Sequence, residues 1–353
     1  MIREGLARLV EDHNLSYTES REAMMEIMSG KTTDSQIAAF LTALRMKGES
    51  VEEIAAFAGV MRECSHRIHP KVSGRLLDTC GTGGDGLKTF NVSTAAAFVI
   101  AGAGIAVAKH GNRSVTSRCG SADVLEQLGF NLTMEPDTVK DAIEQVGIGF
   151  MFAPVFHPAM KYAILPRKEI GVRTVFNILG PLTNPACANA QLLGVYDNKL
   201  VEPLAYVLRE LGCEEAMVVH GLAGLDEVST LGKTTIARLR EGRVSCFDVV
   251  PEDFGINPTT ETDLRISTPK ESTEIIFRIL FGDCKVNDPK QEIVLVNSAV
   301  GIMVAGEAED FTYAMEVARK SIDSGSAYGK LKDLIRTSKG DLSKLEELEA
   351  KYV

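Results

Sequence analysis

Short apolar runs, glycine-rich turns and helical patterns alternate along this chain from about residue 74, and this alternation constrains its fold most. Apolar runs with strand character occupy residues 76–77, 105–108, 192–195 and 217–219. Residues 234–239 and 243–249 flank a short turn and predict a hairpin. Strand, glycine-rich turn, helix and strand in succession are typical of an α/β domain. We therefore predict an α/β domain over residues 71–353, ending in helices near 292–303, 311–323 and 328–336.

The first 70 residues have a different pattern and predict a small all-helical domain. Three capping-box signatures, Ser16 with Glu19, Thr33 with Gln36 and Ser50 with Glu53, each precede an apolar stripe of helical spacing. Such short amphipathic helices must bury their apolar faces against something. We expect them to pack together and to carry a dimer contact, with a further contribution from about residues 165–185.

Composition restricts the partners and the compartment. The chain has 353 residues and a formal charge of −10, so it lacks the broad basic surface that binding to nucleic acid needs. Its start is charged, unlike a secretory signal, and its longest apolar stretch, residues 95–108, is too short to span a bilayer. Seven scattered cysteines without a CxxC pair indicate reduced thiols. We expect a cytoplasmic protein that binds neither membrane nor nucleic acid.

The sharpest local feature is the glycine-rich stretch at residues 78–86 (DTCGTGGDG), between an apolar run and an apparent helix start. Glycines allow positive φ and let an anion approach the backbone amides. Asn91 or Ser93 could cap the helix, whose N-terminus favours a phosphate. The stretch matches neither a phosphate-binding Walker loop nor a dinucleotide fingerprint. Taken alone, the stretch favours a simple tight turn between a strand and a helix over a phosphate site.

A second polar loop follows the next apolar run. Residues 109–121 (KHGNRSVTSRCGS) carry three cations, His110 and several hydroxyls. Within an acidic protein, such a loop suggests a small polyanionic ligand, although a solvated surface loop is the simpler alternative. Ser121 to Asp123 should cap the next helix. Two such loops at successive strand ends favour a ligand site, because α/β sheets bind ligands there.

Together these motifs resemble anthranilate phosphoribosyltransferases. The resemblance rests on residues 80–86 (CGTGGDG), 91–94 (NVST), 109–113 (KHGNR), 120–125 (GSADVL) and 175–185 (VFNILGPLTNP), and extends over essentially the whole chain. Arg118 and Cys119 depart from it slightly, keeping charge or size. The resemblance implies a small helical domain and a larger α/β domain with a central mixed sheet flanked by helices, the fold type of pyrimidine nucleoside phosphorylases. It also implies Mg²⁺ dependence and a homodimer.

The activity implied by the resemblance is transfer of the phosphoribosyl group of phosphoribosyl pyrophosphate (PRPP) to the amine of anthranilate, in tryptophan biosynthesis. Position by position, the resemblance implies that the donor is held by glycine-loop residues, the following helix start and the second loop. The expected PRPP set is Gly81, Gly84, Asp85, Thr89, Asn91, Val92, Ser93, Thr94, Lys109, His110, Gly111, Asn112, Arg113, Ser114, Val115, Thr116, Ser117 and Ser121. Ser93 is also expected near a metal.

The metal and the acceptor have their own candidates. Asp226 and Glu227 follow an apolar run, and adjacent carboxylates suit Mg²⁺, although a helix cap beside a solvated glutamate is the alternative. Arg167 matches the family position that binds the anthranilate carboxylate, a contact that suits a guanidinium fork; without the resemblance it would be a surface arginine. The expected anthranilate set is Gly81, His110, Asn112, Arg167, Gly180 and Pro181. His157 is expected to pack, and Arg173 has no assigned role.

The expected chemistry is displacement of pyrophosphate at ribose C1 with oxocarbenium character. The protein must hold and neutralise the leaving group, and an unprotonated aromatic amine needs no strong base. We assign no general acid or base, because no histidine–carboxylate arrangement adjoins the loops. The alternatives are a pyrimidine nucleoside phosphorylase-like enzyme and a non-enzymatic relative that binds nucleic acid.

Overall fold

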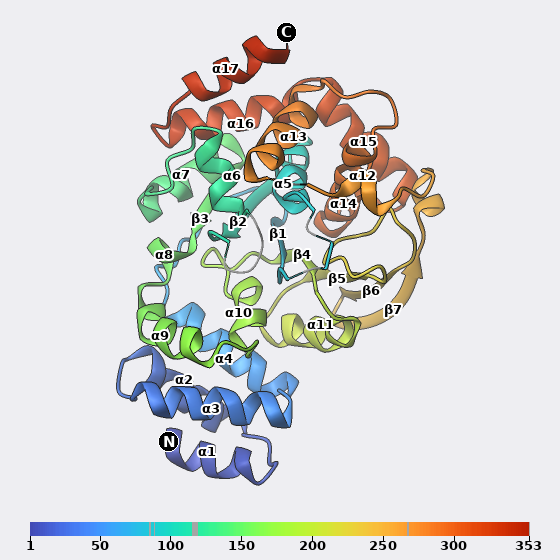
Figure 1. Cartoon of the computed structure of the whole chain (residues 1–353). Helices are drawn as coiled ribbons and strands as arrows, with labels where there is room; N and C mark the ends of the chain where they lie inside the picture. Colours follow the sequence, from blue (N-terminus) through green and yellow to red (C-terminus); the bar gives the residue numbers. More distant parts are fainter. Residues whose placement is uncertain (85, 88, 115–118, 267, 353) are drawn as a thin grey trace.

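A computed structural model describes residues 1–84, 86–87, 89–114, 119–266 and 268–352. A helical part at one end carries the N-terminus, and a larger α/β part ends in the C-terminal helix at the other end (Figure 1). The helical part begins with α1 (Ile2–Val10), α2 (Tyr17–Met28), α3 (Asp34–Lys47) and α4 (Val51–Glu63). The three expected capping boxes are all present, at Ser16, Thr33 and Ser50. Local sequence therefore decides where these helices begin.

One seven-stranded sheet forms the centre of the α/β part. Its strands are β1 (Leu76–Gly81), β2 (Ala106–Gly111), β3 (Ile148–Phe152), β4 (Ala190–Gly194), β5 (Glu215–Gly221), β6 (Thr234–Arg240) and β7 (Arg243–Val249). The spatial order is β3-β2-β1-β4-β5-β6-β7; neighbours among the first five are parallel, and the last two strands pair antiparallel. The expected strands and hairpin are confirmed, whereas β3 was not foreseen. The chain moves outward in opposite directions from β1 and β4, which is where open α/β sheets place their ligand crevice.

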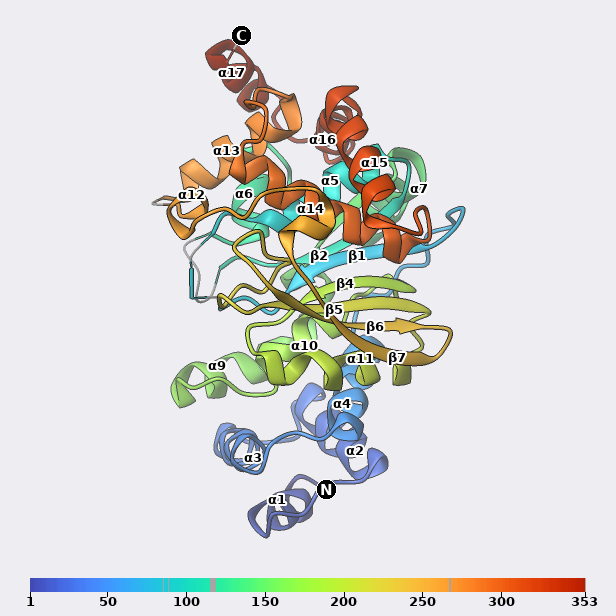
Figure 2. The ribbon, with the colours of Figure 1, turned by 90° about the vertical axis from the view of Figure 1, so that its right-hand side faces the viewer.

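Helices cover both faces of this sheet (Figure 2). On one face lie α5 (Val92–Gly102), α6 (Ser121–Gln127), α7 (Pro136–Val146), α12 (Glu261–Leu264), α13 (Pro269–Phe281), α14 (Pro289–Ala305), α15 (Phe311–Asp323), α16 (Ser326–Thr337) and, outermost, α17 (Ser343–Tyr352). The other face carries α10 (Phe176–Leu182) and α11 (Val201–Glu210), with α4 beyond them. The fold class is therefore the expected one, and all three expected C-terminal helices form.

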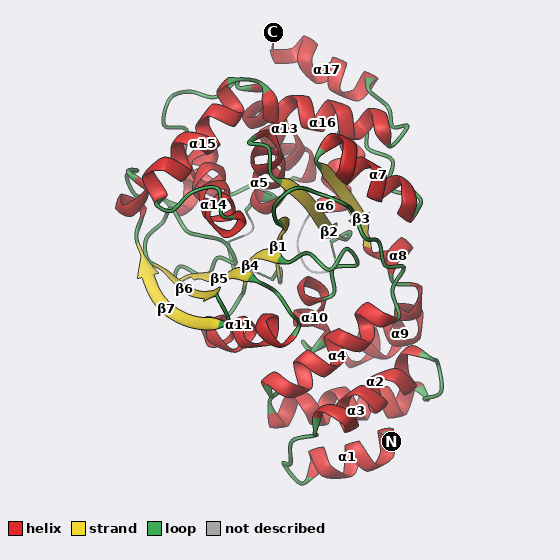
Figure 3. Ribbon diagram, turned by 180° about the vertical axis from the view of Figure 1, so that it is seen from behind, coloured by secondary structure: helices red, strands yellow, loops and turns green. Residues whose placement is uncertain are grey.

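The connection between β3 and β4 crosses to the helical part. After α8 (Ala153–Phe156), α9 (Lys161–Ile170) packs against α2 and α3, and α10 packs against α4. Seen from behind, α9 and α10 lie between the sheet and the N-terminal helices (Figure 3). The crossing segment thus belongs spatially to the helical end of the molecule.

Two apolar cores lie on opposite faces of the sheet. One contains α5, α14 and the neighbouring helices, with Leu77 and Val107 from the strands. The other joins the N-terminal helices to α10 and α11, with Leu193 and Val218 from the same sheet. Successive residues of a strand point to opposite faces, so β4 and β5 each supply apolar residues to both cores.

Two further findings concern the cysteines and the length of the helices. The seven cysteines, all within the described part, are free thiols. Among the described residues, no helix is long and apolar enough to cross a membrane.

Candidate active site

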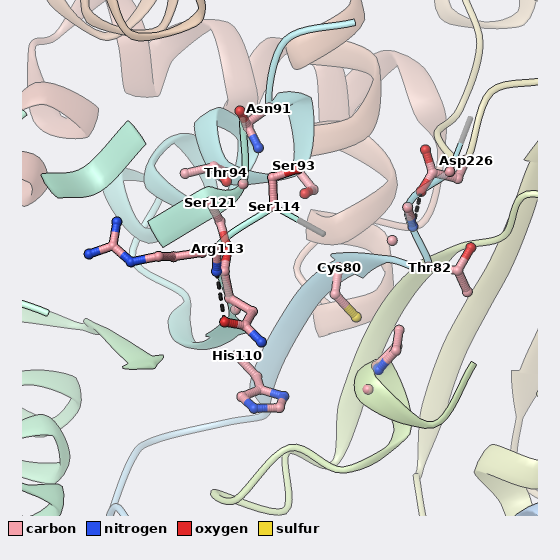
Figure 4. Close-up of a pocket in the computed structure, with 18 of the residues that line it drawn as sticks. Cys80, Thr82, Asn91, Ser93, Thr94, His110, Arg113, Ser114, Ser121 and Asp226 are labelled. Carbon is pink, nitrogen blue, oxygen red and sulfur yellow. Dashed lines mark hydrogen bonds between the residues drawn. The ribbon is translucent and has the colours of Figure 1, made fainter. Parts of the chain in front are cut away.

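A cleft of about 330 Å³ opens where β1 and β2 end, beside α10. Figure 4 shows side chains from the two strand-end loops, from the start of α5 and from the segment after β5 converging on it. Its volume is that of a small-molecule site. The cleft lies at the carboxyl ends of the parallel strands, where the chain leaves β1, as the strand order predicts.

Most of the expected site residues lie together in this cleft. The expected residues that line it are Gly81, Gly84, Thr89, Asn91, Ser93, Thr94, Lys109, His110, Gly111, Asn112, Arg113, Ser114, Ser121, Arg167, Gly180, Pro181, Asp226 and Glu227. Val92 is wholly buried in α5 and is not among the lining residues. Asp85, Val115, Thr116 and Ser117 lie outside the described residues, as does Arg118.

The glycine-rich loop is held by its backbone and by Asp226. The amide of Thr82 donates to the carbonyl of Gly194 (2.9 Å), and that of Gly83 donates to Asp226 Oδ2 (2.7 Å). Gly83 and Gly84 have φ of 70° and 79°, the left-handed region that glycine adopts without strain. A Cβ at Gly81 would approach Asp226 Oδ2 to 2.5 Å. Glycine therefore serves both the turn and the close approach of the carboxylate.

Arg173, which the sequence left unassigned, also contacts this loop. Its guanidinium donates to the carbonyl of Gly84 (2.9 Å) and stacks over the ring of Tyr196 at 4.2 Å. The segment that carries the acceptor candidates is thereby tied to the glycine-rich loop.

The start of α5 corrects one expectation. Asn91 occupies the N-cap position, but its side chain makes no capping bond among the described residues. Its Nδ2 instead donates to the carbonyl of Cys119 (3.2 Å), and its Oδ1 accepts from Ser272 Oγ (3.1 Å). The amide of Ser93 donates to Glu227 Oε1 (3.1 Å). The helix N-terminus thus meets an anionic group, in agreement with its dipole.

Lys109 supplies a buried positive charge to the cleft. Its Nζ donates to the carbonyl of Thr79 (2.5 Å) and to Ser93 Oγ (3.4 Å), and no described carboxylate lies within ion-pair distance. Burial lowers the pKa of Lys109, and burial raises the pKa of nearby Asp78 to about 6. A buried ammonium without an ion-pair partner is costly, and an anionic ligand would relieve that cost.

Arg113 differs from what the basic loop suggested. Its guanidinium pairs with Asp123 (3.0 Å) and Glu126 (2.7 Å) on α6 and points away from the other labelled side chains (Figure 4). Asp123 also accepts from the amides of Ser114 and Gly120, and Gly120, not Ser121 as expected, is the N-cap of α6. Arg113 lines the cleft, but its guanidinium is neutralised by these carboxylates and orders the loop.

Two adjacent carboxylates form the candidate metal site. Asp226 is buried, which raises its pKa, and its Oδ2 accepts the amide bond from Gly83. Glu227 reaches the start of α5, where the Ser93 hydroxyl lies. The described residues contain no group of three or more histidine, cysteine and carboxylate side chains able to hold a metal by themselves. Two carboxylates and a hydroxyl fit Mg²⁺, which commonly takes its other ligands from water and substrate phosphates.

The opposite end of the cleft suits a planar anion. Arg167 on α9 lies over the ring of Phe176 at 4.9 Å, and no described carboxylate pairs with it. Burial lowers the pKa of Arg167. Gly180 and Pro181 add a wall formed by α10. A half-buried guanidinium beside an aromatic ring can bind the carboxylate of a flat aromatic ligand.

His110, which lines the cleft, forms a buried pair with His157. Their ring centroids lie 5.0 Å apart, and both Nε2 atoms are buried without a hydrogen-bond partner among the described groups. Burial lowers the pKa of His110 to about 3 and that of His157 to about 4. Both imidazoles are neutral at pH 7, and His157 packs as expected.

These imidazoles predict a stability that depends on pH. Their folded-state pKa values lie below the ordinary value of about 6.5, so the folded protein binds fewer protons than the unfolded chain. The stability they contribute is therefore complete above about pH 6.5 and is lost as the pH falls toward 4, by about 1.4 kcal/mol per pH unit per histidine. Urea unfolding at pH 7, 6 and 5 should show a shallower decline for His157→Gln. The exposed control His13→Gln should keep the wild-type slope; equal slopes for all three proteins would contradict the prediction.

Several lining residues were not foreseen as site residues. They are Cys80, Thr82, Gly83, Phe90, Cys119, Gly120, Ala153, Phe176 and Asn177. Most adjoin an expected residue and lie within the quoted motifs. Asn177 accepts from the amide of Thr174 (2.9 Å) and so fixes the start of α10. Ala153 follows the unforeseen strand β3, and no local signal identified it.

Comparison with known proteins identifies the family. The family model described as "Glycosyl transferase family, a/b domain" matches residues 73–328, and "Glycosyl transferase family, helical bundle domain" matches residues 3–65. The anthranilate phosphoribosyltransferase of Desulfosudis oleivorans is 49% identical over 341 residues, covering 97% of this chain and 100% of that protein.

Solved structures agree with this relationship. The anthranilate phosphoribosyltransferase of Thermus thermophilus has a TM-score of 0.89 at 39% identity, covering 95% of this chain and 99% of that one. The Saccharomyces cerevisiae enzyme in complex with PRPP and Mg has a TM-score of 0.88 at 31% identity, covering 96% and 98%. The fold, the cleft and nearly full-length similarity lead to one conclusion: this chain belongs to the anthranilate phosphoribosyltransferase family.

Proposed function

We propose that this chain transfers the phosphoribosyl group of PRPP to the amine of anthranilate, releasing pyrophosphate, with Mg²⁺ as its metal. The observation that carries this proposal is the division of the cleft. Backbone amides, Lys109 and the Asp226–Glu227 pair lie at one end, and Arg167 lies beside Phe176 at the other. The first end suits a metal-bound diphosphate and the second an aromatic carboxylate.

The residues act by binding and positioning. The glycine-rich loop and the start of α5 hold the donor, and Lys109 offsets negative charge on it. Mg²⁺, held by Asp226, Glu227 and the Ser93 hydroxyl, would neutralise the charge that grows on the leaving pyrophosphate. Arg167 orients anthranilate so that its amine faces ribose C1. We assign no general base, because the described cleft brings no histidine–carboxylate pair to the acceptor.

One assay tests the proposal. Protein, PRPP, Mg²⁺ and anthranilate are mixed, and the loss of anthranilate fluorescence is followed. We expect consumption that requires both PRPP and Mg²⁺. Folded protein that consumes no anthranilate, but cleaves a pyrimidine nucleoside with phosphate, would support the phosphorylase alternative instead.

We also propose the organisation and the setting of the enzyme. Residues 1–70 with about 165–185 would form the helical domain, residues 71–353 would form the phosphoribosyl-binding domain, and the helical domain would make a homodimer contact. Exposed apolar side chains on and after α9 support this contact: Ile164 is 58%, Leu165 50% and Val172 58% exposed. Free cysteines fit the reducing cytoplasm.

A further inference from the structure

The last turn of α10 forms the acceptor wall of the cleft, yet its carbonyls are bound from outside the helix. The final four carbonyls of any helix lack partners within it, and in α10 these belong to residues 179–182, among them Pro181. The carbonyl of Gly180 accepts from Thr183 Oγ1 (3.0 Å) and interacts with the His110 ring of β2. The next two carbonyls depend on side chains from distant parts of the chain.

Gln191, on β4, holds the first of these carbonyls. Its Nε2 donates to the carbonyl of Pro181 at 2.6 Å. The same nitrogen lies 3.1 Å from Cys80 Sγ and 3.5 Å from Asp78 Oδ2, both on β1. Gln191 is only 4% exposed, so solvent cannot replace this bond. It therefore ties the acceptor wall to the strands that carry the donor loop.

Arg62, in the last turn of α4, binds the second of these carbonyls, that of Leu182. Its Nε donates to the carbonyl of Leu182 (2.8 Å), and its Nη1 donates to that of Leu211, at the end of α11 (3.3 Å). No carboxylate of the described residues pairs with Arg62. Its charge instead lies at the C-terminal ends of two helices, where the helix dipole favours a cation. A half-buried arginine held in this way joins the N-terminal helices to the acceptor wall.

We infer that Arg62 and Gln191 are positioning residues that set the distance of the Gly180–Pro181 wall from the acceptor, so that the N-terminal helices take part in anthranilate binding. The inference rests on the proposed function and extends it. Neither side chain lines the cleft, so both act through the backbone of α10. Both carbonyls lie on α10, and neither side chain bonds to residues 81–84 of the donor loop, so PRPP binding should change much less than anthranilate binding when these bonds are lost.

The test compares Arg62→Met and Gln191→Met with wild-type protein in steady-state assays that vary each substrate in turn. Losing one such bond should raise the anthranilate KM about tenfold, with the PRPP KM within about twofold and kcat near wild type. Arg62→Lys, which keeps a donor for the carbonyl of Leu182, should recover part of the loss. Arg21→Met, which removes the Arg21–Glu63 ion pair elsewhere in the same helices, is the matched control and should change neither KM.

Each possible outcome either supports the inference or overturns it. A lower kcat with both KM values unchanged means fewer folded molecules, and would overturn the inference; so would equal changes in both KM values. If Arg62→Met does not fold, judged by its thermal shift with PRPP and Mg²⁺, Gln191→Met decides alone. Wild-type protein that consumes no anthranilate would refute the proposed function, and the inference with it. Active wild-type protein with unaffected variants would refute the inference only.

Discussion

Replacing Arg167 with alanine should raise the anthranilate KM about ten- to hundred-fold while the PRPP KM stays near its wild-type value. A charge-assisted hydrogen bond to a carboxylate contributes about 1.5–3 kcal/mol, and its loss falls on the substrate that carries the carboxylate. The guanidinium lies beside Phe176 with no described carboxylate as its partner, so it is available to the acceptor. Initial rates from anthranilate fluorescence give the anthranilate KM at saturating PRPP, and the PRPP KM when PRPP is varied at a fixed anthranilate concentration.

Lys168→Ala is the matched control for this substitution. Lys168 is the next residue of α9, also cationic, but exposed and not among the residues that line the cleft. Its variant should retain wild-type kinetics. Anthranilate kinetics that are unchanged in Arg167→Ala would place the carboxylate elsewhere in the cleft.

The double substitution Asp226→Asn and Glu227→Gln should lower turnover at limiting Mg²⁺ about hundred-fold or more. It should also raise the half-saturating Mg²⁺ concentration about tenfold or more. The amides keep the size of both side chains, and the asparagine Oδ1 can still accept from the amide of Gly83. The double variant therefore removes negative charge while leaving the loop contacts in place. Turnover measured across a Mg²⁺ titration separates metal affinity from maximal rate.

A pair of exposed, adjacent carboxylates supplies the comparison. Glu346→Gln with Glu347→Gln in α17 makes the same change of charge far from the cleft. Its Mg²⁺ titration should match that of the wild-type protein. If the Asp226–Glu227 double variant also matched, the metal would be held by other groups.

Much of the fold could be predicted because its signals are local. The capping boxes at Ser16, Thr33 and Ser50 involve residues three apart, so sequence alone locates the starts of three helices. Apolar runs located four parallel strands and the hairpin. β3 was missed because Ile148–Phe152 is a short apolar run directly after Gly147, the residue that ends α7, and periodicity alone does not distinguish such a run from helix.

The candidate site was less predictable where contacts between residues distant in the sequence determine the orientation of a side chain. Asn91 has the chemistry of a cap, but Ser272 and Cys119, distant in the sequence, bind its side chain. Arg113 looks like a ligand for an anion until α6 folds and brings Asp123 and Glu126 to it. Arg62 gave no signal, because an arginine in a helix shows its role only when the ends of α10 and α11 surround it. Side-chain partners separated by many residues depend on the completed fold.

The arrangement of the two apolar cores has a consequence for how the molecule gains its structure. The N-terminal helices have no separate apolar core. Their residues Phe40 and Phe57 belong to the core that also contains Leu179 of α10, Leu204 of α11 and Leu193 of β4. A short bundle that buries its apolar face partly against later parts of the chain gains its full stability only after those parts have been made. The family models assign residues 3–65 and 73–328 to separate domains, but the two segments share this core. We therefore expect them to unfold as one cooperative unit on this side of the sheet. We therefore expect the acceptor end of the cleft, formed by α9 and α10, to assemble together with the docking of the N-terminal helices that pack against it.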